Sequence, residues 1–97
     1  MPIYISLLTY THQGITTIKQ SPARLDAAKE VYRMAGGELK AFYLTMGQYD
    51  AVVIAELPDD VAGAKIALTL GAKGNVRTET LRAFTEDEFR RVVTDLP

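Results

Sequence analysis

The feature that most constrains the fold is an unbroken apolar run near the middle of the chain, Ala51-Val52-Val53-Ile54-Ala55. A strand points successive side chains to opposite faces of a sheet, so apolar residues at every position indicate a central strand covered on both faces. The run lies between Asp50 and Leu57, and Pro58 ends it. The rest of the chain must therefore supply neighbouring strands and packed layers.

Three other segments have the composition of strands. Residues 3–9 and 75–84 alternate between two faces, as does the segment 38–45. In the segment 38–45, Leu39, Ala41 and Tyr43 are expected on one face and Phe42 and Leu44 on the other. The connection Met46-Gly47-Gln48-Tyr49 is short enough to join two strands as a hairpin, and Gly47 suits a turn position with positive φ.

Three helices are predicted where apolar residues recur at three- and four-residue spacing after a capping signal. The first follows Ser21 as N-cap and Pro22, and the second follows Asp59 or Asp60 and carries Val61, Ala64, Ala67, Leu68 and Leu70. The third opens with the capping-box spacing Thr85-Glu86-Asp87-Glu88. Its apolar face consists of Phe89, Val92, Val93 and Leu96.

This order predicts a single α+β domain, residues 1–97, with a ferredoxin-like β-α-β-β-α-β fold and a C-terminal helix. Right-handed crossovers make the four-stranded sheet antiparallel between neighbours and place the helices on one face. The other face keeps apolar side chains, which favours pairing with the sheet of a second copy. The alternative is that the C-terminal helix folds back over part of that face.

Composition excludes several classes of function. The net charge of −1 argues against nucleic acid or an anionic membrane as the main partner. With no cysteine and one histidine, we expect no disulfide, metal site or cofactor. No apolar run is long enough to span a bilayer, and the opening residues lack the pattern of a signal peptide, so we expect a cytoplasmic protein.

Several separated blocks resemble the GYD domain family, small proteins named for a Gly-x-Tyr-Asp stretch. That stretch is Gly47-Gln48-Tyr49-Asp50, within the segment from Thr45 to Val53. The other matching blocks are Gln13-Gly14-Ile15, Ser21-Pro22-Ala23-Arg24, Phe42-Tyr43-Leu44-Thr45 and the segment from Gly74 to Phe84. The resemblance implies a fold of the dimeric α+β barrel type and leaves the function open.

The predicted topology gathers polar residues from three loops at one edge of the sheet. If the first two strands are parallel, the first strand ends where the third and fourth begin. We therefore expect a ligand-binding rim that consists of His12, Gln13, Tyr49, Asp50, Asn75 and Arg77, with Tyr43 nearby. A second candidate is an apolar cavity between two paired sheets, lined by Tyr4, Tyr10, Phe42, Tyr43 and Thr45.

Two functional hypotheses follow. The first is a homo-oligomeric module that binds a small molecule or acts in protein interactions. The alternative is a cofactor-independent enzyme, an oxygenase or isomerase, with His12 as the base, Asp50 orienting it, and Tyr49 or Arg77 stabilising negative charge. Purely structural assembly is a third reading. The structural explanation of the same residues is that Asp50 caps the hairpin, Tyr49 packs its ring and His12 is solvated.

Overall fold

The computed structural model describes all 97 residues and contains the predicted order of strands and helices. The strands are β1 (Ile3–Tyr10), β2 (Glu38–Leu44), β3 (Ala51–Glu56) and β4 (Val76–Ala83). The helices are α1 (His12–Thr16), the short 3₁₀ helix η1 (Ile18–Gln20), α2 (Ser21–Met34), α3 (Asp60–Ala72) and α4 (Glu86–Thr94). No helix has the length and apolarity needed to cross a bilayer.

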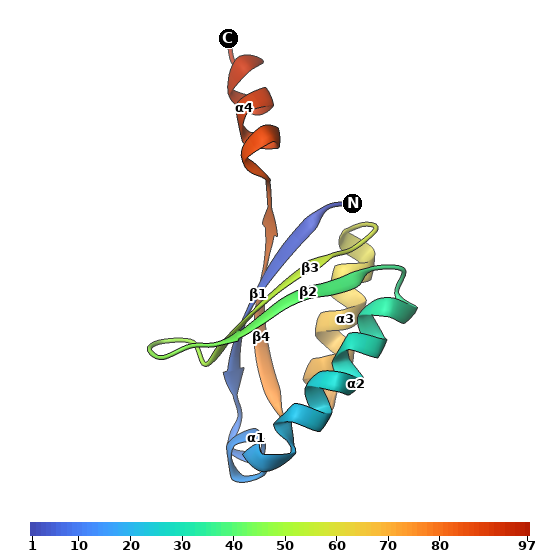
Figure 1. The fold of residues 1–97 in the computed structure, drawn as a ribbon, viewed down its shortest axis with the longest axis vertical. Helices are drawn as coiled ribbons and strands as arrows, with labels where there is room; N and C mark the ends of the chain where they lie inside the picture. The colour runs from blue at the N-terminus through green and yellow to red at the C-terminus, as the bar shows by residue number, and fades with distance from the viewer.

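The sheet has the order β2-β3-β1-β4, and every neighbouring pair is antiparallel. β1 and β3 are central, as the apolar run predicted for β3. Helices α2 and α3 lie together on one face of the sheet (Figure 1). The α+β, ferredoxin-like fold is therefore confirmed.

The core lies between that face and the two helices. Ala51, Val53 and Ala55 of β3 are buried there, together with Tyr4 and Leu8 of β1. On the opposite face, Val52 and Ile54 are only half-buried, because nothing in the chain covers them. Only 11 of the 97 residues are buried, so the chain has a small core for its size.

Strand β2 departs from the predicted alternation. Its pairing with β3 shifts register between Leu39 and Ala41, so that Leu39 pairs with Ala55 and Ala41 with Ile54. A bulge of this kind moves side chains across the sheet. Leu39 therefore shares the helix-covered face with Phe42, and the prediction that it would share a face with Ala41 and Tyr43 is wrong.

Two local predictions for the helices also need correction. Ser21 has helical dihedral angles and is not an N-cap, because η1 runs directly into α2 and Gln20 precedes the helix without a side-chain bond. In α3, Gly63 and Ile66 face the core, whereas Val61 and Leu68 are exposed. The predicted caps of α3 and α4 are confirmed: Asp59 accepts the Ala62 N–H at 2.9 Å, and Thr85 forms a capping box with Glu88.

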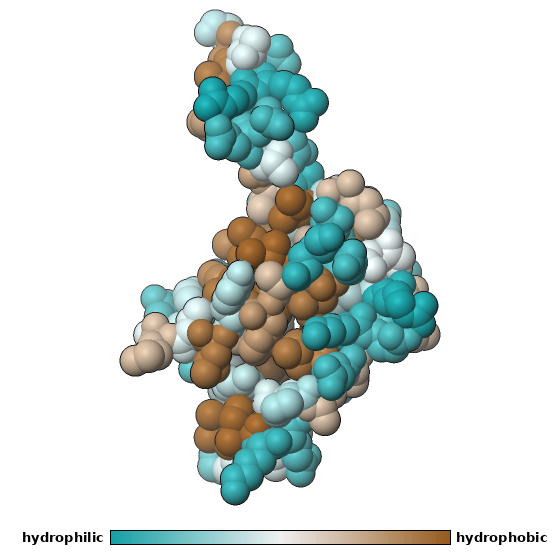
Figure 2. Space-filling model, in the orientation of Figure 1, coloured by the Kyte–Doolittle hydropathy of each residue, from teal (hydrophilic) through white to brown (hydrophobic).

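Helix α4 points away from the rest of the molecule (Figure 1). It does not fold back over the open sheet face, so the alternative of a C-terminal cover is wrong for the isolated chain. Its predicted apolar side chains, Phe89, Val92, Val93 and Leu96, are between 48% and 61% exposed. Figure 2 shows apolar side chains over the strands and along one edge of α4.

Candidate functional site

The three segments of the predicted rim lie at the edge where β1 ends. Leu8 pairs with Ala51, Tyr10 pairs with Val76, and Leu44 pairs with Ala51 on its other side. The end of β1, the β2–β3 loop and the start of β4 therefore meet, as the topology predicted. The rim residues differ in what they contact: Gln13 and Asn75 bond to each other, whereas Tyr49 and Asp50 bond to residues outside the predicted set.

The Gly-x-Tyr-Asp segment forms a tight, self-bonded turn. Asp50 accepts the Tyr10 N–H through Oδ2 at 2.9 Å, and its own N–H donates to the Leu8 carbonyl at 2.8 Å. The Thr45 hydroxyl donates to the Tyr49 carbonyl at 2.7 Å. Gly47 has φ of +124°, a conformation that favours glycine. Asp50 therefore has a structural role, although its carboxylate bonds to β1 rather than capping the hairpin itself.

A second set of bonds ties the loop after β1 to the loop before β4. The Thr11 N–H donates to the Asn75 carbonyl at 3.1 Å, and the Gln13 amide donates to Asn75 Oδ1 at 3.0 Å. The Thr11 hydroxyl caps α1 by accepting the Gly14 N–H at 3.1 Å. Gly14 is required here, since a Cβ would lie 2.0 Å from the Asn75 carbonyl oxygen. Gln13 and Asn75 are thus brought together as expected.

The structure does not form the proposed His12–Asp50 pair. His12 is the first residue of α1, is exposed and makes no side-chain hydrogen bond, while Asp50 is directed to β1. The Tyr49 hydroxyl donates to Glu79 at 2.6 Å, and this bond raises the pKa of Tyr49. Tyr43 and Arg77 are exposed, Tyr43 on the open sheet face. No group of three His, Asp or Glu side chains is placed to share a metal ion.

The predicted cavity between two sheets is wrong in its residues. Tyr4, Tyr10 and Phe42 point to the helix-covered face, because Tyr4 and Phe42 share the pleat of the buried β3 residues and Tyr10 follows the alternation of β1. Tyr4 donates a hydrogen bond to Asp60 at the start of α3, and burial, together with this bond, raises its pKa. Only Tyr43 of the aromatic residues named for that cavity lies on the open face.

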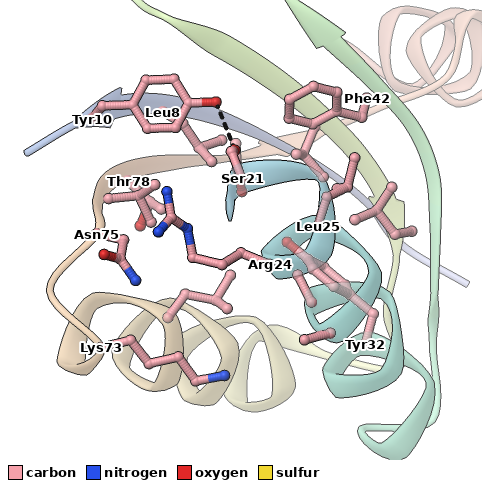
Figure 3. A pocket seen from close by; sticks show the side chains of 17 residues that line it. Leu8, Tyr10, Ser21, Arg24, Leu25, Tyr32, Phe42, Lys73, Asn75 and Thr78 are labelled. Atoms are coloured by element: carbon pink, nitrogen blue, oxygen red, sulfur yellow. Dashed lines mark hydrogen bonds between the residues drawn. The ribbon is translucent and has the colours of Figure 1, made fainter. Parts of the chain in front are cut away.

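Sequence reasoning missed a different cavity, which lies inside the protomer between α2 and the sheet (Figure 3). It has a volume of about 120 Å³, and 11 of its 17 lining residues are hydrophobic. Tyr10 and Ser21 both line it, and their hydroxyl oxygens lie 3.3 Å apart. A signal existed in the sequence: Ser6 interrupts an apolar face of β1, and Arg24 stands on the inward side of α2.

The chain also has two exposed apolar surfaces. The open sheet face carries Ile5, Leu7, Val52, Ile54 and Leu81, and the second surface is the apolar face of α4. On the helix-covered face, Arg82 lies over the ring of Phe84 at 4.7 Å and over that of Tyr4 at 5.7 Å. This stacking holds the start of the α4 connection against the body of the molecule.

Comparisons with known proteins agree with the sequence resemblance. The family model described as the GYD domain matches residues 4–93. The chain is also similar to a Thermus thermophilus protein named glutamine synthetase and cystathionine beta-lyase binding protein, with 36% identity over 84 residues. That alignment covers 86% of this chain and 88% of the relative. No solved structure gives a significant match.

Proposed function

We propose that this chain, which belongs to the GYD domain family and has a relative named as a binding protein, is a homo-oligomeric interaction module. In this proposal it pairs with a second copy through the open sheet face and α4, and the pair binds other proteins. The observation that carries the proposal is α4: an amphipathic helix that points away from the rest of the chain and leaves its apolar side chains 48–61% exposed.

Helix α4 needs a partner to be stable. It has nine residues, and isolated helices shorter than about 12 residues are marginal in water. Its capping box helps to start the helix but does not bury its apolar face. Burying an exposed Phe, Val or Leu side chain completely contributes about 1.5–3 kcal/mol, so Phe89, Val92 and Leu96 favour a docked helix.

A second copy of this chain supplies the matching surface. The open sheet face is apolar at its centre and lacks a covering layer, and α4 is an apolar helix without a sheet beneath it. In a two-fold symmetric pair each protomer offers both surfaces, so each sheet and each α4 gains cover in one step. The small core of the single chain supports the same conclusion.

Sedimentation velocity at micromolar concentration tests the pairing. The wild-type chain should sediment as a dimer, whereas Val92→Glu in α4 and Leu81→Glu on the open sheet face should sediment as monomers. Arg91→Gln is the matched control, because it lies beside Val92 outside the apolar face and changes the net charge by the same unit. A monomeric wild-type protein, or a dimeric Val92→Glu variant, would contradict the proposal.

The name of the relative also suggests which proteins to test as partners. We propose that this chain binds the glutamine synthetase or the cystathionine beta-lyase of its own organism. Biolayer interferometry with each purified enzyme should give saturable binding to at least one of them. Absence of binding to both at tens of micromolar would reject these two enzymes as partners, and the dimer measurement would stand independently.

A further inference from the structure

The cavity between α2 and the sheet lies away from both surfaces used in the proposed function. Its apolar lining comes from side chains of the sheet and of α2, including Phe42 and Ala28. Figure 3 shows the polar ends of Arg24 and Asn75 on the same side of this space, with Lys73 at the α3 end, its nitrogen apart from them. The cavity is therefore amphipathic, with an apolar interior and a polar mouth.

The size of the interior limits what it can hold. An apolar cavity of about 150 Å³ accommodates benzene, so a volume of about 120 Å³ suits a compact tail of about four to six carbons. Long acyl chains and nucleosides are too large. An apolar tail gains free energy here because the lining offers few polar groups to water.

The charge at the mouth indicates the sign of the ligand. Arg24 and Lys73 line the cavity, and no Asp or Glu lines it, although the whole chain has a net charge of −1. Arg24 is half-buried, and its hydrogen bonds go only to neutral acceptors: the Thr17 hydroxyl and carbonyl and the Gly14 carbonyl. Neither cation forms a salt bridge within the chain.

Hydrogen-bond donors remain at the same place. Arg24 bonds through its two terminal nitrogens, and its Nε makes no hydrogen bond. Asn75 uses Oδ1 to accept from Gln13 and leaves its amide nitrogen without a partner. A carboxylate at the mouth would receive charge-assisted hydrogen bonds, which are about twice as strong as neutral ones.

We propose that this cavity is a binding site for small monocarboxylates whose compact apolar tail fills the space between α2 and the sheet and whose carboxylate faces Arg24, Lys73 and Asn75. The site belongs to a single protomer, so it does not depend on the pairing proposed above. Its occupancy ties α2 to the loop before β4, since Arg24 and Asn75 come from those two segments.

Benzoate is the probe for this site, in a ¹⁵N NMR titration with thermal unfolding measured in parallel. Benzoate should shift amide signals of α2 and residues 73–78 and raise the unfolding temperature. Acetate has the carboxylate without the apolar ring, and benzamide has the apolar ring with an uncharged amide in place of the carboxylate. Each should bind at least about tenfold more weakly, a difference of about 1.4 kcal/mol.

Three variants test the contacts of the apolar tail and those of the carboxylate separately. Ala28→Leu fills the cavity while keeping both cations and should abolish binding. Arg24→Gln should weaken binding about tenfold, and Lys73→Gln provides the same test without touching the bonds that Arg24 makes to α1. Lys29→Gln, outside the cavity on α2, should bind as the wild type does.

Benzoate binding can be measured independently of the dimerisation proposed above. Val92→Glu should bind benzoate normally even as a monomer. Unchanged cavity amides at millimolar benzoate, unchanged binding in Ala28→Leu, or equal binding of benzamide and benzoate would each overturn the inference.

Discussion

At the scale of single residues, Asp50 shows how the Gly-x-Tyr-Asp segment acts. Its carboxylate accepts the Tyr10 N–H at 2.9 Å. We expect Asp50→Ala to lower the free energy of unfolding by about 1–2 kcal/mol, because a partly buried N–H loses its acceptor. Asp50→Asn keeps an acceptor oxygen and should cost less. Urea denaturation measures both effects.

His12→Ala is the control for this prediction. His12 is exposed and makes no side-chain hydrogen bond, so the free energy of unfolding should change by less than about 0.5 kcal/mol. If His12→Ala lowered the free energy of unfolding as much as Asp50→Ala, His12 would have to make a stabilising contact that is absent from the structure.

Gly14 gives a steric prediction at the rim. A Cβ at this position would lie 2.0 Å from the backbone oxygen of Asn75, so Gly14→Ala should destabilise the protein by about 1–3 kcal/mol. Gly71 is the matched glycine, because a Cβ there meets nothing within 4 Å. Gly71→Ala should leave stability unchanged or raise it by about 0.5–1 kcal/mol. Equal thermal unfolding temperatures for the two variants would contradict the close approach.

Two buried tyrosines predict sensitivity to alkaline pH. Burial raises the pKa of Tyr4 and Tyr32, and the hydrogen bond to Asp60 raises that of Tyr4 further. Because the folded values exceed the unfolded one, their stabilising effect is complete below about pH 10 and is lost as the pH rises through the folded values. The urea midpoint should fall in that window, less steeply in Tyr4→Phe and Tyr32→Phe. Tyr43→Phe, at an exposed position, should follow the wild type.

At the scale of elements, the sequence predicted those features that depend on residues close together in the chain. The caps at Asp59 and Thr85 were found because an N-cap bonds within its own helix turn. The bulge between Leu39 and Ala41 was missed, because a register shift depends on the partner strand. The exposure of Val61 and Leu68 was missed for a related reason: the close approach of α3 to Tyr4 at Gly63 decides which side faces the sheet.

Helix α4 predicts an effect on association that is separate from the stability of the core. Its capping box consists of the Glu88 N–H bonded to Thr85 at 3.1 Å and the Thr85 N–H bonded to Glu88 at 2.9 Å. Thr85→Ala should destabilise α4 by about 1 kcal/mol. Since both helices of the proposed dimer lose this cap, the dissociation constant should rise about five- to thirtyfold in sedimentation equilibrium.

Asp59→Ala is the corresponding change in a helix that packs against the sheet. It removes the cap of α3, so it should lower the urea midpoint of the fold while leaving the dissociation constant unchanged. If Thr85→Ala behaved like Asp59→Ala, α4 would belong to the core of its own chain rather than to a dimer contact.

At the scale of the whole molecule, the topology of the sheet and the meeting of three loops at the rim were predictable, because short right-handed connections leave few arrangements. The direction of α4 was not predictable, since its apolar side chains remain 48–61% exposed and do not pack into the core. For the cavity, Ser6 and Arg24 were a signal of polar residues in its lining, but its volume was not predictable because it depends on how α2 packs over β1 and β2. Gln13 and Asn75 were predicted to lie near each other because Gln13 follows the end of β1 and Asn75 directly precedes β4.

The two uncovered surfaces lead to a prediction about the stability of the whole assembly. If the open sheet face and α4 are covered only in a dimer, unfolding and dissociation are coupled, and the urea midpoint must rise with protein concentration. A tenfold increase in concentration adds about 1.4 kcal/mol to the free energy that separates dimer from unfolded chains. The midpoint of Val92→Glu should not depend on concentration, because that variant folds as a monomer with only its core of eight buried hydrophobic residues. A wild-type midpoint that stays constant over a hundredfold range of concentration would show that the single chain is stable with both surfaces exposed to water.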